Sequence, residues 1–359
     1  MELEKELKYV FSQFKTATSF KNFKTINSGH INDTYLIFTT KKPNYILQKI
    51  NGQVFKNASQ VIENKIKISK FLEKQKVKTL NFISTKNNKF YVKDEDDNCW
   101  NLSIYIEESQ TFLEVKSPKV AFEAGKITGS FLAKTLKFDG ELTETLPNFH
   151  SMSFRFQEFE NSLKIASQKR KEKAKNWIDF ALSKKEEMML LEKAIIQKEI
   201  PFRVTHNDTK ISNILFDKNK NAICMIDLDT VMKGVIHFDY GDALRTICNT
   251  ATEDEIDINK IDFNFDYFRN YTTGFLESMA DTISKNELKF LPISIKIMTF
   301  IMGLRFLTDY LNNDIYYKTN YKEHNLDRAK NQFTFVKKIA ENQQEINNFI
   351  RGHYCNYLL

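Results

Sequence analysis

The stretch that decides the fold of this 359-residue chain runs from Val204 to Asp229 and reads VTHNDTKISNILFDKNKNAICMIDLD. Asp208 follows His206 by two residues, Asn213 follows Asp208 by five, and Asp227 ends the next apolar run. Short apolar segments rich in β-branched residues flank these side chains, and a polar DKNKN turn joins the last two segments. The pattern predicts a small hairpin that holds polar groups on a loop and at strand ends.

The polar groups of this stretch suit phosphoryl transfer. Asp208 can accept a proton from a hydroxyl, while the amide oxygen of Asn213 and the carboxylate of Asp227 can hold Mg²⁺ against phosphates. Asp229 is a second candidate ligand, because residues two apart on an extended chain point to the same face. Lys210 is either a charge neutraliser for the transferring phosphoryl group or a solvated loop lysine. The segment predicts kinase-type chemistry.

Two further side chains near this loop are expected to have structural roles. His206 is interpreted as a histidine that braces the loop and takes no part in proton transfer. Asp242, in HFDYGDALR, is expected to cap or brace the start of a helix close to the catalytic loop.

Composition limits the classes of protein that fit. The chain is 42% hydrophobic with a net charge of +7, and charges of both signs are scattered along it, so a nucleic-acid partner is not expected. The N-terminus lacks the apolar core of a signal peptide, and uninterrupted apolar runs fall short of the about 18 residues of a membrane span. Four dispersed cysteines without a CxxC pair predict free thiols in the cytoplasm. The oligomeric state stays open.

The first third of the chain predicts a small sheet with one main helix. After an N-terminal amphipathic helix, strands are predicted over 23–26, 34–39, 45–50, 89–92 and 102–106. A helix is predicted over 59–75, between the third and fourth strands, with Ser59 as N-cap. Beyond residue 117 the pattern is helical outside the hairpin, with helices over 120–136, 154–167, 177–197, 240–248, 265–280, 292–311 and 325–349. The length and this change predict an α+β protein with lobes over 1–108 and 109–359.

The first lobe carries candidates for holding a nucleotide. Lys49 lies on a strand among apolar neighbours and could reach phosphates, with Glu63 on the following helix holding it by an ion pair, although alone Lys49 would be read as a surface lysine. The turn over 27–33 contains Gly29 and is either a phosphate loop or an ordinary hairpin turn. The backbone of Tyr105 and Ile106 could bond an adenine edge, and simple strand packing is the alternative for their side chains.

Six motifs in order resemble the aminoglycoside phosphotransferase and choline kinase class of small-molecule kinases. They are GHINDTY (29–35), YILQKIN-x-x-VFKN (45–57), HNDTKISNILFD (206–217), IDLDTVMKG (226–234), FDYGDALR (238–245) and RFLTDYLN-x-D-x-YYK (305–318). Within the class, the kinases that phosphorylate N-acetylhexosamines are the most similar. The resemblance implies a bilobal protein-kinase-like fold, ATP and Mg²⁺ as donor, and transfer to the anomeric hydroxyl of GlcNAc or GalNAc.

The resemblance also implies which residues lie near the sugar. They are the turn residues His30, Asn32 and Asp33, together with Arg305. A plainer reading of Arg305 is an intrahelical ion pair with Asp309, four residues on.

Two other functions remain open from the sequence. One is a kinase for another small alcohol, such as an aminoglycoside, choline or homoserine. Cationic acceptors of that kind favour acidic or aromatic pockets, and Arg305 argues mildly against them. The other is a non-catalytic kinase-like binding module. The presence of Lys49, Asp208, Asn213 and Asp227 together argues against it.

Overall fold

The computed structural model describes residues 2–26 and 31–357, which form two compact units. Unit 1 comprises Met1–Thr111, Lys137–Pro147 and Ser212–Lys233. Unit 2 comprises Phe112–Leu136, Asn148–Ile211 and Gly234–Leu359. The first unit therefore ends close to the predicted boundary at residue 108 and also takes in two later segments.

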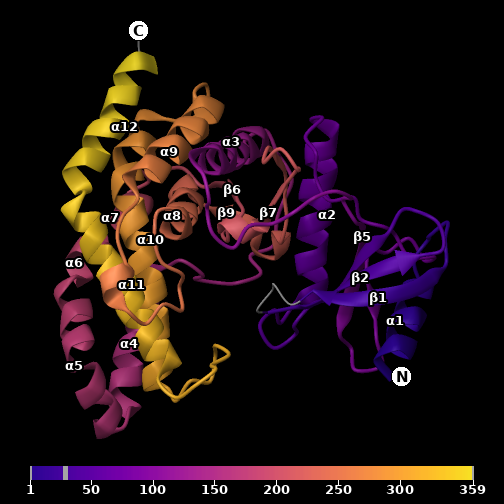
Figure 1. The fold of residues 1–359 in the computed structure, drawn as a ribbon, viewed down its shortest axis with the longest axis horizontal. Coiled ribbons are helices and arrows are strands. Elements are labelled where there is room, and N and C mark those ends of the chain that lie inside the picture. The colour runs from indigo at the N-terminus through magenta and orange to yellow at the C-terminus, as the bar shows by residue number, and fades with distance from the viewer. Residues whose placement is uncertain (1, 27–30, 358–359) are drawn as a thin grey trace. The chain divides into compact units, whose positions relative to one another are not determined.

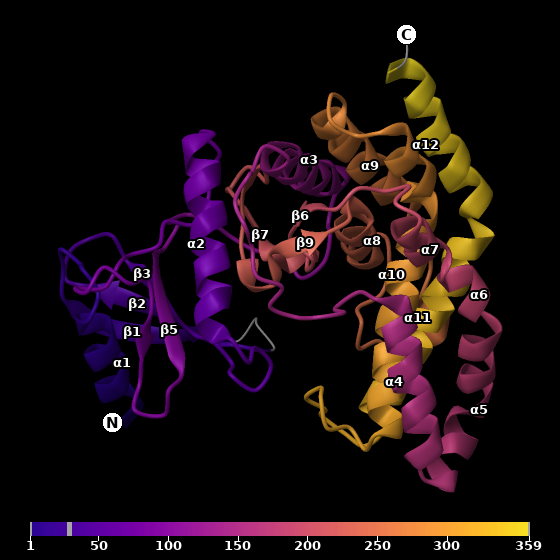
Figure 2. The ribbon, with the colours of Figure 1, turned by 180° about the vertical axis from the view of Figure 1, so that it is seen from behind.

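Unit 1 is built on a five-stranded antiparallel sheet in the order β1-β2-β3-β5-β4 (Figure 1). The strands are β1 (Phe20–Ile26), β2 (Asp33–Thr39), β3 (Tyr45–Lys49), β4 (Val92–Lys93) and β5 (Cys99–Ile104). Helix α1 (Glu2–Ser12) covers one face and helix α2 (Ala58–Lys74) the other, as both views show (Figures 1 and 2).

The alternation of side chains along β3 assigns its residues to these two faces. Tyr45 and Leu47 pack into a cluster with the apolar side of α1. Ile50, directly after the strand, packs into a cluster with the apolar side of α2. Since side chains alternate in a strand, Gln48 shares the α2 face and Lys49 shares the α1 face.

The predicted hairpin forms within unit 1. Strand β7 (Ile214–Phe216) pairs with β8 (Ala222–Met225), preceded by the 3₁₀ turn η1 (Ile211–Asn213) and followed by η2 (Leu228–Thr230). Phe216 also exchanges backbone hydrogen bonds with Gln110, at 2.8 and 2.9 Å, which ties the hairpin to the chain after β5. Two other short strands are β6 (Arg203–Thr205) and β9 (Met232–Gly234).

Unit 2 is helical. Its helices are α3 (Pro118–Thr135), α4 (Met152–Ile165), α5 (Gln168–Ser183), α6 (Lys185–Met188), α7 (Leu190–Ile196), α8 (Ile236–Ile247), α9 (Phe265–Met279), α10 (Lys285–Leu311), α11 (His324–Glu341) and α12 (Gln343–Tyr357), with a 3₁₀ turn η3 (Ile258–Lys260). Helix α10 lies among α4, α8 and α11 (Figure 2). By length and composition alone α10 could span a membrane, but 72% of its apolar window is buried inside the unit, which is the pattern of a core helix.

The antiparallel sheet and the helical unit confirm the predicted α+β class. Three local predictions are wrong. The helix predicted over 177–197 is broken into α5, α6 and α7, and the one over 325–349 ends at Glu341 and restarts at Gln343. The cap of α2 is Asn57, without a side-chain bond, and Ser59 is inside the helix.

Candidate active site

The loop that carries Asp208 is fastened to helix α8 by a buried carboxylate. Asp239, in the first turn of α8, accepts the backbone N–H of His206 at 2.8 Å and of Asn207 at 2.7 Å. Its backbone carbonyl accepts the Thr209 hydroxyl at 2.6 Å. Burial raises the pKa of Asp239 to about 6. Sequence reasoning gave Asp239 no role, because its two acceptor bonds go to backbone groups that leave no trace in residue type.

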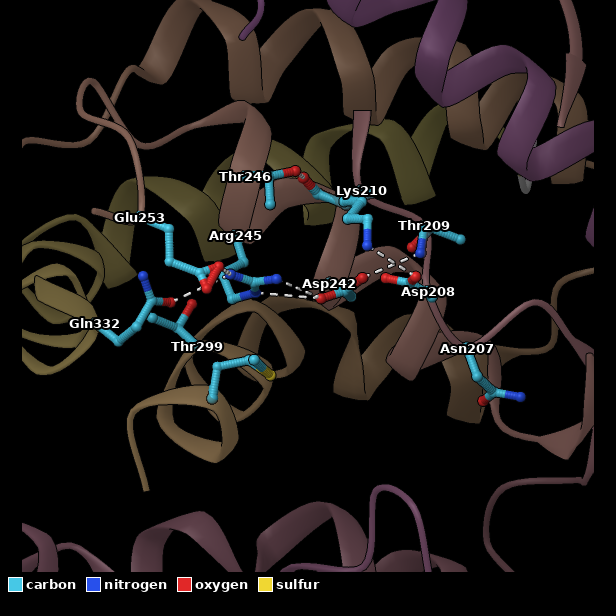
Figure 3. Close-up of polar contacts among 12 residues, drawn as sticks. Asn207, Asp208, Thr209, Lys210, Asp242, Arg245, Thr246, Glu253, Thr299 and Gln332 are labelled. Atoms are coloured by element: carbon cyan, nitrogen blue, oxygen red, sulfur yellow. Dashed lines mark hydrogen bonds and ion pairs between the residues drawn. The ribbon is translucent and has the colours of Figure 1, made fainter. Parts of the chain in front are cut away.

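A second carboxylate on α8 supports the same loop (Figure 3). Asp242 accepts the Thr209 N–H at 3.0 Å and pairs with Arg245 at 3.1 Å. Arg245 in turn pairs with Glu253 at 3.2 Å, so its charge is held on both sides. Asp242 thus braces the catalytic loop, as one reading of the sequence expected. It lies inside α8 and does not cap it, because α8 begins six residues earlier, at Ile236.

Asp208 faces a cation and a histidine from its own loop. The Lys210 ammonium lies 3.0 Å from its carboxylate (Figure 3). The backbone N–H of Asp208 donates to Nδ1 of His206 at 3.3 Å, which places His206 as a brace of the loop. Burial acts to raise the pKa of Asp208, but the charge of the neighbouring Lys210 ammonium and its hydrogen bond outweigh burial and hold the pKa below its usual range. The carboxylate is therefore ionised at neutral pH, the state that accepts a proton.

The candidate metal ligands belong to unit 1. The Ile226 N–H donates to the Asn213 carbonyl at 2.9 Å, so Asn213 lies beside the residue that precedes Asp227. Asp227 has a left-handed backbone, with φ of 60° and ψ of 52°. A non-glycine residue in that region costs free energy, and residues held in this way are frequent at functional sites.

This pair of oxygen donors fits Mg²⁺, which takes one or two protein oxygens and keeps several waters. Among the described residues there is no group of three or more His, Cys, Asp or Glu side chains of the kind that cages a transition metal. Asp229, the other predicted ligand, already accepts hydrogen bonds from two side chains of unit 1. Its two carboxylate oxygens accept from the ammonium of Lys65 on α2 and from the side-chain amide of Asn32.

The predicted Lys49–Glu63 ion pair is wrong. Lys49 lies on the α1 face of the sheet, where it pairs with Asp94 at 3.2 Å and Glu6 at 3.4 Å, with its ammonium 5.1 Å from the Trp100 ring centre. Glu63 is exposed on α2, and α2 packs on the opposite face. One step of strand alternation separates the two faces, and sequence alone did not give that register.

The remaining first-lobe candidates have diverse surroundings. Gly29 and His30 lie outside the described residues. Asp33 is exposed and precedes Tyr35, which packs on the α1 face. In the segment directly after β5, which we call the hinge (residues 105–106), the Tyr105 N–H donates to the Asn44 carbonyl at 2.9 Å, and the Ile106 carbonyl accepts from Ser109 at 2.6 Å. Among the residues that the structure describes, the Tyr105 carbonyl and the Ile106 N–H have no hydrogen-bond partner and can meet an adenine edge.

Arg305, in unit 2, is surrounded by aromatic rings, and these residues together are called the aromatic surround. Its guanidinium lies 5.3 to 5.7 Å from the ring centres of Phe149, Tyr316 and Tyr317. The intrahelical pair with Asp309 does not form. Asp309 accepts three consecutive backbone N–H groups, those of Ile315, Tyr316 and Tyr317, at 2.9 to 3.0 Å.

A histidine that sequence reasoning missed joins this surround to the catalytic loop. Nε2 of His150 lies 3.0 Å from the Asn207 carbonyl, and its ring centre lies 4.3 Å from that of Phe149. Its Nδ1 is buried without a hydrogen-bond partner among the described residues. Burial lowers the pKa of His150 to about 3, so the ring is neutral. The segment LPNFHSM, which carries His150, contains no motif that would have marked it.

Residues 22–270 match the phosphotransferase enzyme family, abbreviated APH. The chain belongs to this family. Membership of a phosphotransferase family agrees with the coarser part of the resemblance.

Solved structures with the same fold cover nearly the whole chain at low identity. A microcompartment-associated aminopropanol kinase has a TM-score of 0.66 at 12% identity, over 96% of this chain and 98% of its own. An aminoglycoside phosphotransferase from Alicyclobacillus acidocaldarius has a TM-score of 0.62 at 12% identity, over 96% of each chain. Amicoumacin kinase, solved with AMP-PNP and Ca²⁺, has a TM-score of 0.61 at 12% identity, over 95% and 93%. At such identity they show the fold alone.

Proposed function

We propose that the chain transfers the γ-phosphoryl group of ATP to the anomeric hydroxyl of an N-acetylhexosamine, GlcNAc or GalNAc, and so makes the sugar 1-phosphate. Asp208 orients the acceptor hydroxyl and accepts its proton. Lys210, in contact with Asp208, neutralises charge on the transferring group. Asn213 and Asp227 would hold Mg²⁺, which would neutralise negative charge on the phosphates.

One observation carries the acceptor assignment. The rings next to the catalytic loop surround the Arg305 guanidinium, and the charge of a second arginine, Arg155, opposes it even though Arg155 pairs with Glu158 at 2.6 Å. A cationic acceptor such as choline or an aminoglycoside would add to that repulsion. A neutral sugar with an amide meets donors and aromatic faces there, which is the chemistry that its hydroxyls and carbonyl need.

The first lobe contributes candidates for the donor and the sugar. The hinge at Tyr105 and Ile106 would meet the adenine edge, and the turn with Gly29 would lie over the phosphates. Asn32, already held by Asp229, and its neighbours His30 and Asp33 are proposed sugar contacts together with Arg305. Asp229 then acts by positioning and leaves the metal to Asp227 and Asn213.

An acceptor panel tests the proposal. The wild-type protein is incubated with ATP·Mg²⁺ and GlcNAc, GalNAc, glucose, choline, homoserine or kanamycin, and the product is examined by phosphorus NMR. An acid-labile glycosyl phosphate made from the N-acetylated sugars alone is the expected result. Phosphate on the 6-hydroxyl, or turnover confined to an amine-bearing acceptor, would reject the anomeric assignment.

Arg305→Lys and Arg305→Met separate charge from packing in the same panel. Loss of sugar turnover in Arg305→Met with partial retention in Arg305→Lys is expected if the charge contacts the sugar. Lys164→Met, on the exposed end of α4 in the same unit, is the matched control.

A further inference from the structure

A lysine is buried on the face of the sheet that Lys49 does not reach. The side chain of Lys65, on α2, is 2% exposed. Its ammonium donates to the side-chain oxygen of Gln48 at 2.8 Å and pairs with Asp229. Taking an ammonium out of water costs several kcal/mol unless partners compensate. The chain therefore places a compensated positive charge at this point of unit 1.

Gln48 occupies the position on β3 from which a strand lysine would reach the α2 face of the sheet. It lies on β3 next to Lys49 but on the α2 face, and its amide oxygen receives the Lys65 ammonium. On this face of the sheet the positive charge therefore comes from Lys65 on α2, because β3 has no lysine there. The expected arrangement, a lysine on the strand and its acceptor on the helix, is reversed: the lysine is on α2 and its acceptor, Gln48, is on β3.

The surroundings of Lys65 belong to the candidate phosphate site. Asp229 is two residues beyond Asp227, the proposed Mg²⁺ ligand. The other oxygen of Asp229 accepts from Asn32, at the end of the β1–β2 turn, and the Asn32 side-chain oxygen accepts the Asn51 N–H at 2.9 Å. Lys65 therefore lies on one hydrogen-bonded network with the metal-binding segment and with that turn.

The ammonium has a donor to spare. A protonated lysine carries three N–H donors, and among the described residues Gln48 and Asp229 take two of them. We propose that Lys65 binds the α and β phosphates of ATP, with Gln48 and Asp229 as positioning residues, in place of the strand lysine expected from the sequence. This rests on the proposed function only in taking ATP as the phosphoryl donor.

The opposing reading is a structural ion pair that fastens α2 to η2. Under that reading, loss of Lys65 lowers the free energy of unfolding and leaves the folded protein's preference for phosphates unchanged. Nucleotide binding without any acceptor separates the two readings, and it does so whatever the acceptor proves to be.

Calorimetry with adenosine, ADP·Mg²⁺ and ATP·Mg²⁺ is the first measurement. Lys65→Gln is expected to weaken ADP and ATP binding about 10- to 100-fold, the value of a charge-assisted contact, with adenosine unchanged. Lys49→Gln, which removes a charge on the other face, is expected to leave all three affinities within about twofold. An equal loss for adenosine and ATP, or none for either, would overturn the assignment.

The exchange can also be reversed. Gln48→Lys combined with Lys65→Gln returns the cation to the strand and should recover at least about tenfold of the lost ATP affinity. Failure of the double variant to exceed Lys65→Gln, with both folded by circular dichroism, would indicate a structural pair only.

A measurement on the wild-type protein covers the case in which Lys65→Gln does not fold. An ATP acyl phosphate acylates a lysine amine that contacts the phosphates, forming an amide and releasing ATP, and peptide mass spectrometry locates the amide. Labelling of Lys65, suppressed by excess ATP, is expected. Labelling of Lys49 with Lys65 unmodified would refute the proposal. A wild-type protein that binds no ATP at all would instead refute the donor in the proposed function.

Discussion

At the scale of single residues, the Asp208 carboxylate is where the proposed chemistry depends on one group. Asp208→Asn keeps the side-chain shape and removes the proton acceptor. We expect turnover to fall by about 10²- to 10⁴-fold with ATP affinity nearly unchanged. Steady-state rates and calorimetry measure the two effects. Asp96→Asn, an exposed carboxylate in the turn before β5, serves as control. Turnover near wild type in Asp208→Asn would remove Asp208 from the reaction.

Asp239 gives the residue scale a pH signature. Burial raises its pKa to about 6, whereas an unfolded carboxyl titrates near its ordinary value, about 3.9. Between those values the folded state keeps a proton that the unfolded state has released. The free energy of unfolding should therefore fall as pH rises through this window, by on the order of 3 kcal/mol from this group, and level off above it.

Asp239→Asn removes that dependence. Urea unfolding at pH 4.5 and 6.5 should show a smaller difference between the two pH values in the variant than in the wild type. Because the amide cannot accept both loop N–H groups as the carboxylate does, the variant should also turn over more slowly. Identical pH dependence in the two proteins would show that Asp239 ionises normally.

At the scale of elements, helices α3 and α9 pack through glycines. A Cβ added to Gly125 would lie 1.9 Å from the Tyr271 carbonyl oxygen on α9. Backbone cannot yield as a side-chain tip does, so Gly125→Ala should lower the free energy of unfolding by about 1–3 kcal/mol or more. Gly352→Ala, also inside a helix but with nothing within 4 Å of the new Cβ, should be neutral or stabilising. Equal melting temperatures for the two variants would contradict this packing.

Elements also show what the sequence can predict. The hairpin around Asn213 and Asp227 was predictable because strand alternation and turn residues act locally. The break between α11 and α12 at Asn342 was not, since the apolar spacing continues across it. The Lys49–Glu63 pair failed for a third reason. Which face of β3 meets α2 depends on how the whole sheet is covered, and Lys65, two residues after Glu63 and on the buried side of α2, had no sequence feature that set it apart from other helix lysines.

At the scale of the whole molecule, the buried thiols are predicted to be inert. Cys99, Cys224 and Cys248 are free and buried. Burial raises the pKa of Cys224 to about 12 and that of Cys248 well above its ordinary value, so little reactive thiolate forms. Iodoacetamide at pH 8 followed by peptide mass spectrometry should find both unmodified in the native protein and both modified in urea. Native labelling of Cys224 would mean that its unit opens readily.

The residues proposed to act in the reaction come from both units of the chain. The proposed proton acceptor, Asp208, belongs to unit 2 and the proposed metal ligands belong to unit 1, and the division between Ile211 and Ser212 falls inside the motif HNDTKISN. That single motif contains one proposed residue from each unit, Asp208 and Asn213. The acceptor surround, in contrast, draws on segments around residues 150, 305 and 316, and no local pattern links segments so far apart.

The anchoring of the 315–317 loop by Asp309 has a consequence for how such an enzyme diversifies. From this loop the carboxylate accepts main-chain N–H groups, and its other partner is the side-chain amide of Asn325 on α11, so the loop path does not depend on the side chains that the loop displays. Tyr316 and Tyr317 can be exchanged while their backbone stays in register. Selection, or a designed library confined to these codons, can thus explore new acceptors without re-evolving the scaffold, provided that Asp309 is left untouched.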